Sequence, residues 1–330
     1  MNKKRWLSLG IAAVIFFASI LMNSISLLAS SDDKVMSEFF EAEEEVIEDG
    51  DYEQKIVVLD IDGTIADTGE ESSLLSTGGY NHQALLKHLD TVAEDDTIGG
   101  LVLEVNSPGG GVHESAEIHR KIQAVKKAGK PVYVAMGSMA ASGGYYVSTP
   151  ADKIYASPET LTGSLGVIMQ SYNFEGLAEK YGIDFVTIKS GKFKDMGNSF
   201  RDMTDEEKKI LQSLVDNSYN QFVKVIAEGR GMSEEEVRKV ADGRIYDGRQ
   251  AKDLNLIDEL GYIDDAIAGM KKNEDLKGAA VVKLTDTIGF GSMLNLKLTQ
   301  WVGGNNEAGI IKSIMTENQS PQMMYLYSGE

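Results

Sequence analysis

Apolar residues form one unbroken run near the N-terminus and only short runs in the rest of the chain. No charged side chain occurs between residues 6 and 31, and residues 6–29 are mostly apolar. In helical conformation this stretch would reach about 36 Å, more than the roughly 30 Å of a hydrocarbon core. Basic residues at positions 3–5 precede the run and acidic residues follow it. The positive-inside rule therefore leaves the N-terminus in the cytoplasm and the remaining chain outside.

Two interpretations fit this run. A cleaved signal peptide would use Leu27-x-Ala29 as a weak cleavage site. The run is longer than the usual apolar core of a signal peptide, which favours an uncleaved membrane anchor. We therefore expect a cytoplasmic tip at residues 1–5 and a transmembrane signal anchor at residues 6–29.

Beyond residue 54 the pattern changes to short apolar runs, many of them ending near glycine, that alternate with helical stripes. The short runs predict strands, and the stripes, such as Ile118, Ile122 and Val125, predict amphipathic helices. Capping boxes at Thr204…Glu207 and Ser233…Glu236 open two of these helices. Strands are expected at residues 56–61, 99–106, 132–135, 152–156, 163–169, 184–189 and 279–284, and helices at 80–98, 113–129, 173–182, from 204, from 233 and at 263–272. Alternation of this kind predicts an α/β domain at residues 55–285, followed by a C-terminal extension at residues 286–330.

Charge adds a linker to this picture. The formal net charge is −19, and residues 32–53 hold eleven acidic residues and one lysine. We expect residues 30–54 to form a solvated, flexible acidic stalk. The acidic balance argues against a nucleic-acid partner, which requires a basic face. The chain has no cysteine, which excludes a cysteine nucleophile and a thiolate metal site.

Two glycine-rich stretches could carry chemistry. In Ala140-Ala141-Ser142-Gly143-Gly144, small residues surround a serine after a predicted strand, a loosened form of the elbow that exposes a nucleophile. In the stretch NSPGGG at residues 106–111, a strand breaks into a turn whose N–H groups could face a phosphate or an oxyanion. Each stretch by itself could also be an ordinary tight turn.

A nucleophilic serine needs a base. The four histidines, His82, His88, His113 and His119, all precede Ser142, and none has a metal-binding spacing. Lysine is the better candidate, provided that a desolvated setting keeps it neutral. The candidates are Lys189, Lys192 and Lys194, although lysines in a polar loop are ordinarily solvated charges. The only Ser-x-x-Lys spacing, Ser31…Lys34, lies in the stalk.

An alternative function comes from the first predicted strand. Asp60-x-Asp62-Gly63-Thr64 matches the phosphate-transfer loop of a haloacid-dehalogenase-type phosphatase, in which Asp60 would attack phosphorus and both aspartates would hold magnesium. Only Asp264-Asp265 could serve as the later acidic pair of that family. An aspartate pair near a helix start is more often a cap.

Taken together, five stretches resemble the signal peptide peptidase A family, membrane-bound Ser-Lys peptidases: NSPGGGVHESAEIH, MGSMAASGGYYVS, TGSLGV, KSGKFKD and DGRQAKDLNLIDELG. Their order and spacing match along residues 55–285. The resemblance implies a Clp-protease/crotonase-like fold of repeated β-β-α units, usually assembled into rings. The resemblance also implies an enzyme that needs no cofactor and no metal.

The resemblance also implies a role for each matched residue. Ser142 would be the nucleophile, Lys194 the general base, and Ser164 the residue that orients the lysine. The N–H groups of Gly109 and Gly143 would form the oxyanion hole. The implied substrates are apolar peptides, namely remnant signal peptides, cut at the outer face of the cytoplasmic membrane by a ring-shaped homo-oligomer.

Two further hypotheses remain at this point. A non-catalytic, membrane-anchored scaffold would bind peptides without cutting them. The tail SPQMMYLYSGE at residues 320–330 is apolar and has no positive charge, so it resembles the expected substrates. It could enter an active site of its own or of a neighbouring subunit, although packing on the domain is the simpler expectation.

Overall fold

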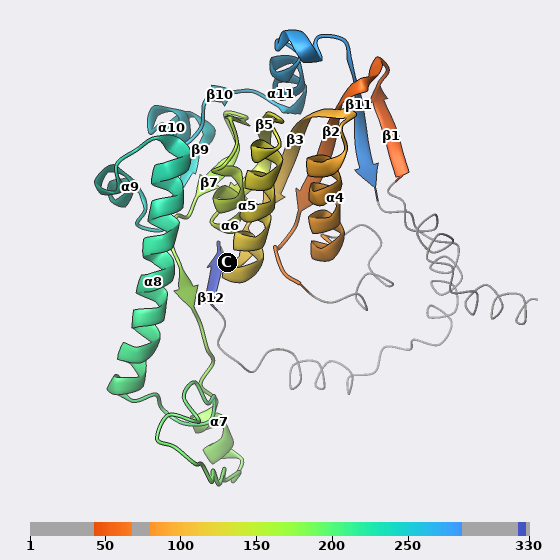
Figure 1. Cartoon of the computed structure of the whole chain (residues 1–330). Helices are drawn as coiled ribbons and strands as arrows, with labels where there is room; N and C mark the ends of the chain where they lie inside the picture. The colour runs from red at the N-terminus through yellow and green to blue at the C-terminus, as the bar shows by residue number, and fades with distance from the viewer. Residues whose placement is uncertain (1–42, 68–79, 286–322, 328–330) are drawn as a thin grey trace, which may run out of the picture. The chain divides into compact units, whose positions relative to one another are not determined.

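The computed structural model describes residues 43–67, 80–285 and 323–327 (Figure 1). The strands are β1 Glu43–Glu48, β2 Asp51–Asp62, β3 Ile98–Ser107, β4 Gly109–Gly111, β5 Val132–Ala141, β6 Lys153–Ala156, β7 Leu161–Gly163, β8 Ile168–Met169, β9 Ile245–Asp247, β10 Glu259–Leu260, β11 Ala279–Thr285 and β12 Met323–Leu326. The helices are α4 His82–Glu94, α5 Val112–Lys127, α6 Gly143–Ser148, α7 Glu175–Lys180, α8 Asp205–Arg230, α9 Glu234–Val240, α10 Gly248–Asp253, α11 Ile263–Met270 and the 3₁₀ turn η1 Glu274–Leu276.

A mostly parallel sheet forms the centre of the domain. Its strand order is β1-β11-β2-β3-β5-β6-β10, and β7 and β9 extend it beside the end of β5. Helices α4, α5 and α6 lie over one face (Figure 1). On the other face, alternate residues such as Ile56, Val58 and Val102 pack with α11 and η1. Burial on both faces explains why the central strands are almost continuously apolar.

Most of the predicted elements are present. The strands at 56–61, 99–106, 132–135, 152–156 and 279–284 become β2, β3, β5, β6 and β11, and both predicted capping boxes open helices, α8 and α9. Two strand predictions were wrong. Residues 184–189 have no regular structure and pair with no strand in the part of the chain that the structure describes; Val186 and Ile188 are 87% and 96% exposed. Residues 163–169 divide into β7 and β8, which belong to different sheets.

The acidic stalk was predicted to extend too far. Residues 43–54 form β1 and the first part of β2, so the domain begins before residue 55. The side chains of residues 44–54 are exposed. In β1, the edge strand of the sheet, exposed charge opposes aggregation. The predicted tip, the anchor at residues 6–29 and the remaining stalk lie outside the described residues. Among the residues that are described, no helix is both long and apolar enough to span a membrane.

An arm projects from the domain between β8 and α8. It contains α7 and lies at the N-terminal end of the long helix α8 (Figure 1). A charged network holds its base, because Arg201 donates to Asp195 at 3.0 Å and to Glu207, in the first turn of α8, at 2.5 Å. Lys189 also donates to Asp195, at 2.6 Å. Hydrogen bonds from Arg201 and from the backbone of Thr204 lower the pKa of Glu207 from 4.5 to about 2.

We predict that Arg201→Met loosens the base of the arm at neutral pH. A carboxylate whose pKa is lowered by folding stabilises the fold above its ordinary pKa, and this contribution is lost as pH falls towards the folded value. The difference in melting temperature between wild type and Arg201→Met should therefore shrink as pH falls from 4.5 to about 2. Arg249→Met, which removes an exposed pair with Glu159, is the control and should show no such pH dependence. A constant difference across this range would contradict the prediction.

Candidate active site

Ser142 lies at the junction between a strand and a helix. It follows the last residue of β5 and caps the N-terminus of α6, with φ 54° and ψ −113°. A positive φ is rare outside glycine, and such a conformation costs on the order of 1–3 kcal/mol unless its surroundings impose it. The Ser142 N–H donates to the Gly163 carbonyl at 2.8 Å. The elbow expected around Ser142 is thus present, and the residue is 1% exposed.

Glycines allow the chain to pack closely around this elbow. A Cβ on Gly143 would lie 2.8 Å from Ser115 Oγ, and one on Gly109 would lie 2.5 Å from the Gly143 nitrogen. The Gly109 φ of 98° is a second reason for glycine there. The strand β4 and the first turn of α6 therefore meet with no side chain between their backbones.

The backbone N–H groups do not all remain free. The Gly109 N–H, an expected oxyanion donor, instead donates to Ser107 Oγ at 3.1 Å. The next nitrogen, that of Gly110, would be 3.1 Å from a Cβ on Gly143. Gly110 is therefore better placed than Gly109 to act with Gly143. The sequence offered three adjacent glycines, and two hydrogen bonds distinguish among them: the Gly109 N–H donates to Ser107 Oγ, and the Gly111 N–H donates to the Ile65 carbonyl at 2.8 Å.

The C-terminal tail lies directly on this glycine strand. β12 pairs antiparallel with β4 on one side, with Tyr325 opposite Gly110, and with β8 on the other. The Tyr325 carbonyl oxygen is only 1.9 Å from the position of a Cβ on Gly109. The Tyr327 N–H donates to the Pro108 carbonyl at 2.9 Å. Residues 323–327 thus pack on the domain, as the simpler expectation had it, and they lie as an extended strand beside the turn at Ser142.

An aromatic cluster holds the tail. The Tyr325 ring is 1% exposed, stacks on Tyr146 at 5.0 Å and lies 4.6 Å from Phe222. Its hydroxyl donates to the Ser218 carbonyl at 3.2 Å. Helices α6 and α8 therefore form a pocket for a large apolar side chain beside Ser142.

Pairing of two strands in the sheet places Ser164 next to Ser142. β7 pairs parallel with the end of β5, with Gly163 opposite Ala141, so the residues that follow each strand are neighbours. Ser164 has φ 51° and is 8% exposed, and its N–H donates to the Arg244 carbonyl at 2.7 Å. The two serines that the sequence separates by more than twenty residues thus lie side by side.

Lys194 is not brought to Ser142 within the chain. It lies in the arm, is exposed, and its ammonium group has no hydrogen bond or ion pair among the described residues. The two rival lysines differ in this respect, since Lys189 pairs with Asp195 at 2.6 Å and Lys192 pairs with Glu206. Of the three candidates, Lys194 alone forms no ion pair with a carboxylate among the described residues.

Three of the histidines have other partners. His82 contacts Tyr80 at 2.5 Å and Glu117 at 3.1 Å, and His113 lies 3.5 Å from Glu117. The ring of His119 lies 5.2 Å from that of Tyr146, and burial lowers its pKa to about 4. These contacts agree with the expectation that lysine is the better candidate for a base.

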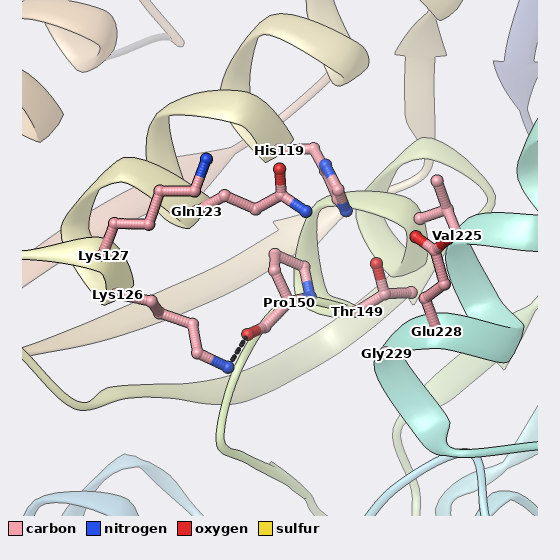
Figure 2. Close-up of a pocket in the computed structure, with 9 residues that line it drawn as sticks. All are labelled: His119, Gln123, Lys126, Lys127, Thr149, Pro150, Val225, Glu228 and Gly229. Carbon is pink, nitrogen blue, oxygen red and sulfur yellow. Dashed lines mark hydrogen bonds between the residues drawn. The ribbon is translucent and has the colours of Figure 1, made fainter. Parts of the chain in front are cut away.

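His119 also lines a pocket of about 350 Å³ between α5, the C-terminal end of α6 and α8 (Figure 2). Gln123, Lys126, Thr149 and Glu228 also line it. The Lys126 ammonium group donates a hydrogen bond to the Pro150 carbonyl at 2.7 Å. None of the predicted catalytic residues lines this pocket. The candidate active site is instead a backbone edge that accepts a strand.

The two aspartates of the phosphatase motif form contacts with other side chains of the domain. Asp60 forms an ion pair with Lys283, and Asp62 accepts a hydrogen bond from Asn106 at 2.8 Å. Within the described part of the chain, no group of three or more histidine or acidic residues could hold a metal ion. Asp264 and Asp265 lie in the first turn of α11, as expected for capping.

Known proteins of similar sequence and structure indicate the family of this chain. The chain is 41% identical, over the full length of both proteins, to the protein named "Putative signal peptide peptidase SppA" in Enterococcus faecium. It is 35% identical to Protease 4 of Salmonella typhi over 67% of this chain and 35% of that protein. Among solved structures, a mutant of ClpP1 from Listeria monocytogenes matches with a TM-score of 0.41 and 20% identity, over 63% of this chain and 93% of that one.

The sequence profile described as Peptidase family S49 matches residues 124–277, a range that includes Ser142, Ser164 and Lys194. Both relatives carry the name of a peptidase or protease. From the full-length match and this profile, the chain belongs to peptidase family S49 and is a serine peptidase.

Proposed function

We propose that Ser142 and Lys194 form a Ser-Lys dyad that cleaves apolar peptides bound as a strand between β4 and β8. The observation that carries this proposal is the position of β12, whose Tyr325 carbonyl lies against the glycines beside Ser142. A peptide bound in that register presents the bond between Tyr325 and Leu326 to the nucleophile.

The reaction is acyl transfer to water. Neutral Lys194 takes the Ser142 proton, and the serine oxygen attacks the peptide carbonyl. The N–H groups of Gly110 and Gly143 stabilise the oxyanion, and Lys194 then protonates the leaving amine. Water repeats these steps on the acyl-enzyme. Loss of one oxyanion donor typically costs about 100- to 1000-fold in rate. Ser164, beside Ser142, orients the lysine.

The lysine comes from a second copy of the chain. Lys194 is exposed on an arm at the far end of α8 from α6 (Figure 1), whereas Ser142 is buried. The arm also exposes apolar side chains that a monomer would leave in water: Tyr172, Phe174, Leu177, Tyr181, Ile183, Phe185, Val186, Ile188 and Phe193. Contiguous apolar surface of this kind marks an interface. Its burial against a neighbour would exclude water around Lys194 and favour the neutral amine.

A head-to-tail contact, in which each arm reaches the next active site, closes into a ring when the rotation per subunit permits. This supports the ring-shaped homo-oligomer of the Clp-protease/crotonase type expected from the sequence. An anchor at residues 6–29 would hold the ring at the outer face of the cytoplasmic membrane. Remnant signal peptides are apolar and are produced there, so they are the proposed substrates.

Individual substitutions test the dyad. Ser142→Ala and Lys194→Ala should each lower kcat for an apolar peptide by at least about 1000-fold, as loss of a nucleophile or base does. Lys192→Ala is the matched control, because it lies two residues away and pairs with Glu206. It should retain activity. Full activity in Lys194→Ala, measured as peptide cleavage by the full chain in detergent, would refute the dyad.

Mixed subunits test whether the site is shared. Ser142→Ala and Lys194→Ala proteins, each inactive alone, should regain activity after they are dissociated and reassembled together. In a randomly mixed ring about a quarter of the sites would pair an intact serine with an intact neighbouring lysine. If the mixture stays inactive although subunit exchange is demonstrated by mass, the lysine is not supplied by a neighbour.

The tail should compete with substrate. Removal of residues 323–330 or Tyr325→Ala should increase the initial rate of cleavage of a short peptide, because the strand position and the aromatic pocket become vacant. Val46→Ala, an exposed change in β1 and outside the arm, controls for general loosening of the surface. Mass spectrometry of wild type and Ser142→Ala tests processing at the bond between Tyr325 and Leu326. An unchanged rate in both tail variants would exclude competition.

A further inference from the structure

The hydroxyl group of Ser115 has no hydrogen-bond partner. Ser115 lies in the second turn of α5 and is 0% exposed. Among the residues that the structure describes, its Oγ is the one buried side-chain nitrogen or oxygen atom without a partner. A buried polar group in this state destabilises the fold, so its presence calls for an explanation.

Other serine and threonine residues in the helices do have a hydrogen-bond partner. Ser148, in α6, is also 0% exposed, but it donates to the Gly144 carbonyl at 2.7 Å. Ser213 and Thr91 bond to carbonyls three and four residues earlier in the same way. This bond to the preceding turn is the usual solution for a helical serine. Ser115 does not form this bond.

The atom that Ser115 meets is part of the candidate active site. A Cβ on Gly143 would lie 2.8 Å from Ser115 Oγ, 3.1 Å from the Gly109 Cα and 3.1 Å from the Gly110 nitrogen. Ser115 therefore lies behind Gly143, on the side where glycine leaves room. Helix α5 starts immediately after β4, so Ser115 is fixed relative to the glycine strand as well.

Gly143 needs such support because the residue before it is strained. Ser142 has φ 54° and ψ −113°, a conformation that persists only where its surroundings leave the chain no room to relax. A residue smaller than serine at position 115 would leave room behind Gly143, so that the peptide unit between Ser142 and Gly143 could rotate. That peptide carries the N–H group that we assign to the oxyanion hole.

We propose that Ser115 is a positioning residue, whose Oγ fixes the Gly143 backbone so that its N–H points into the oxyanion hole. This inference rests on the proposed function. Ser115 acts through Gly143, whose backbone its Oγ approaches. Its contribution therefore appears when the oxyanion forms and is absent from substrate binding.

Ser115→Ala separates this role from a structural one. Removing an unpaired buried hydroxyl group should stabilise the fold and raise the melting temperature, by roughly 2–4 °C for a domain of this size. The same change should lower kcat by about tenfold, less than the loss of an oxyanion donor, and leave KM unchanged. The affinity for a peptide aldehyde, which forms a tetrahedral adduct with serine, should weaken by the same factor as kcat.

Ser148→Ala is the matched control. It removes a buried helical serine that is hydrogen-bonded, so it should lower the melting temperature and leave kcat unchanged. An unchanged kcat in Ser115→Ala would overturn the positioning role while the proposed peptidase stands. A lower melting temperature together with a raised KM would also overturn it, because that result describes general disruption. If the wild type cleaves no peptide, the proposed function and the inference both fail.

Discussion

The strained turn at Ser142 is the constraint on which the rest of the site depends. The strand β5 must end and α6 must begin within one residue, which forces a positive φ on a serine. Such a turn survives only because the sheet fixes one side and close-packed glycines fix the other. The apolar strands that form the core therefore supply rigidity to the site as well as stability to the fold.

Recognition in this site is mainly a property of the backbone. The tail adds an antiparallel strand to β4 and β8, and any extended peptide offers the same N–H and carbonyl groups. Side chains add selectivity where the aromatic cluster of α6 and α8 surrounds Tyr325. This combination suits the proposed apolar substrates, because backbone hydrogen bonds accept varied sequences and the aromatic cluster around Tyr325 can set the register.

The two residues of the proposed dyad differ in their exposure to solvent. Ser142 is buried in the rigid part of the domain, and Lys194 lies exposed on an arm held at its base by Arg201, Asp195 and Glu207. In an isolated subunit the lysine side chain remains exposed to water. A site completed by a neighbour would couple peptide cleavage to assembly and keep unassembled chains inactive.

The sequence by itself determined the α/β class, most strands and helices, and the strand-to-helix turn at Ser142, because apolar periodicity, capping boxes and small-residue turns are local signals. Ser142 and Ser164 remain predicted site residues, and sheet pairing alone puts Ser164 beside Ser142. Tertiary structure decided three further points. The strand predicted at residues 184–189 has no partner, the Gly109 N–H is already bonded to Ser107, and the tail lies in the site. Each depends on contacts between distant segments, which local patterns do not encode.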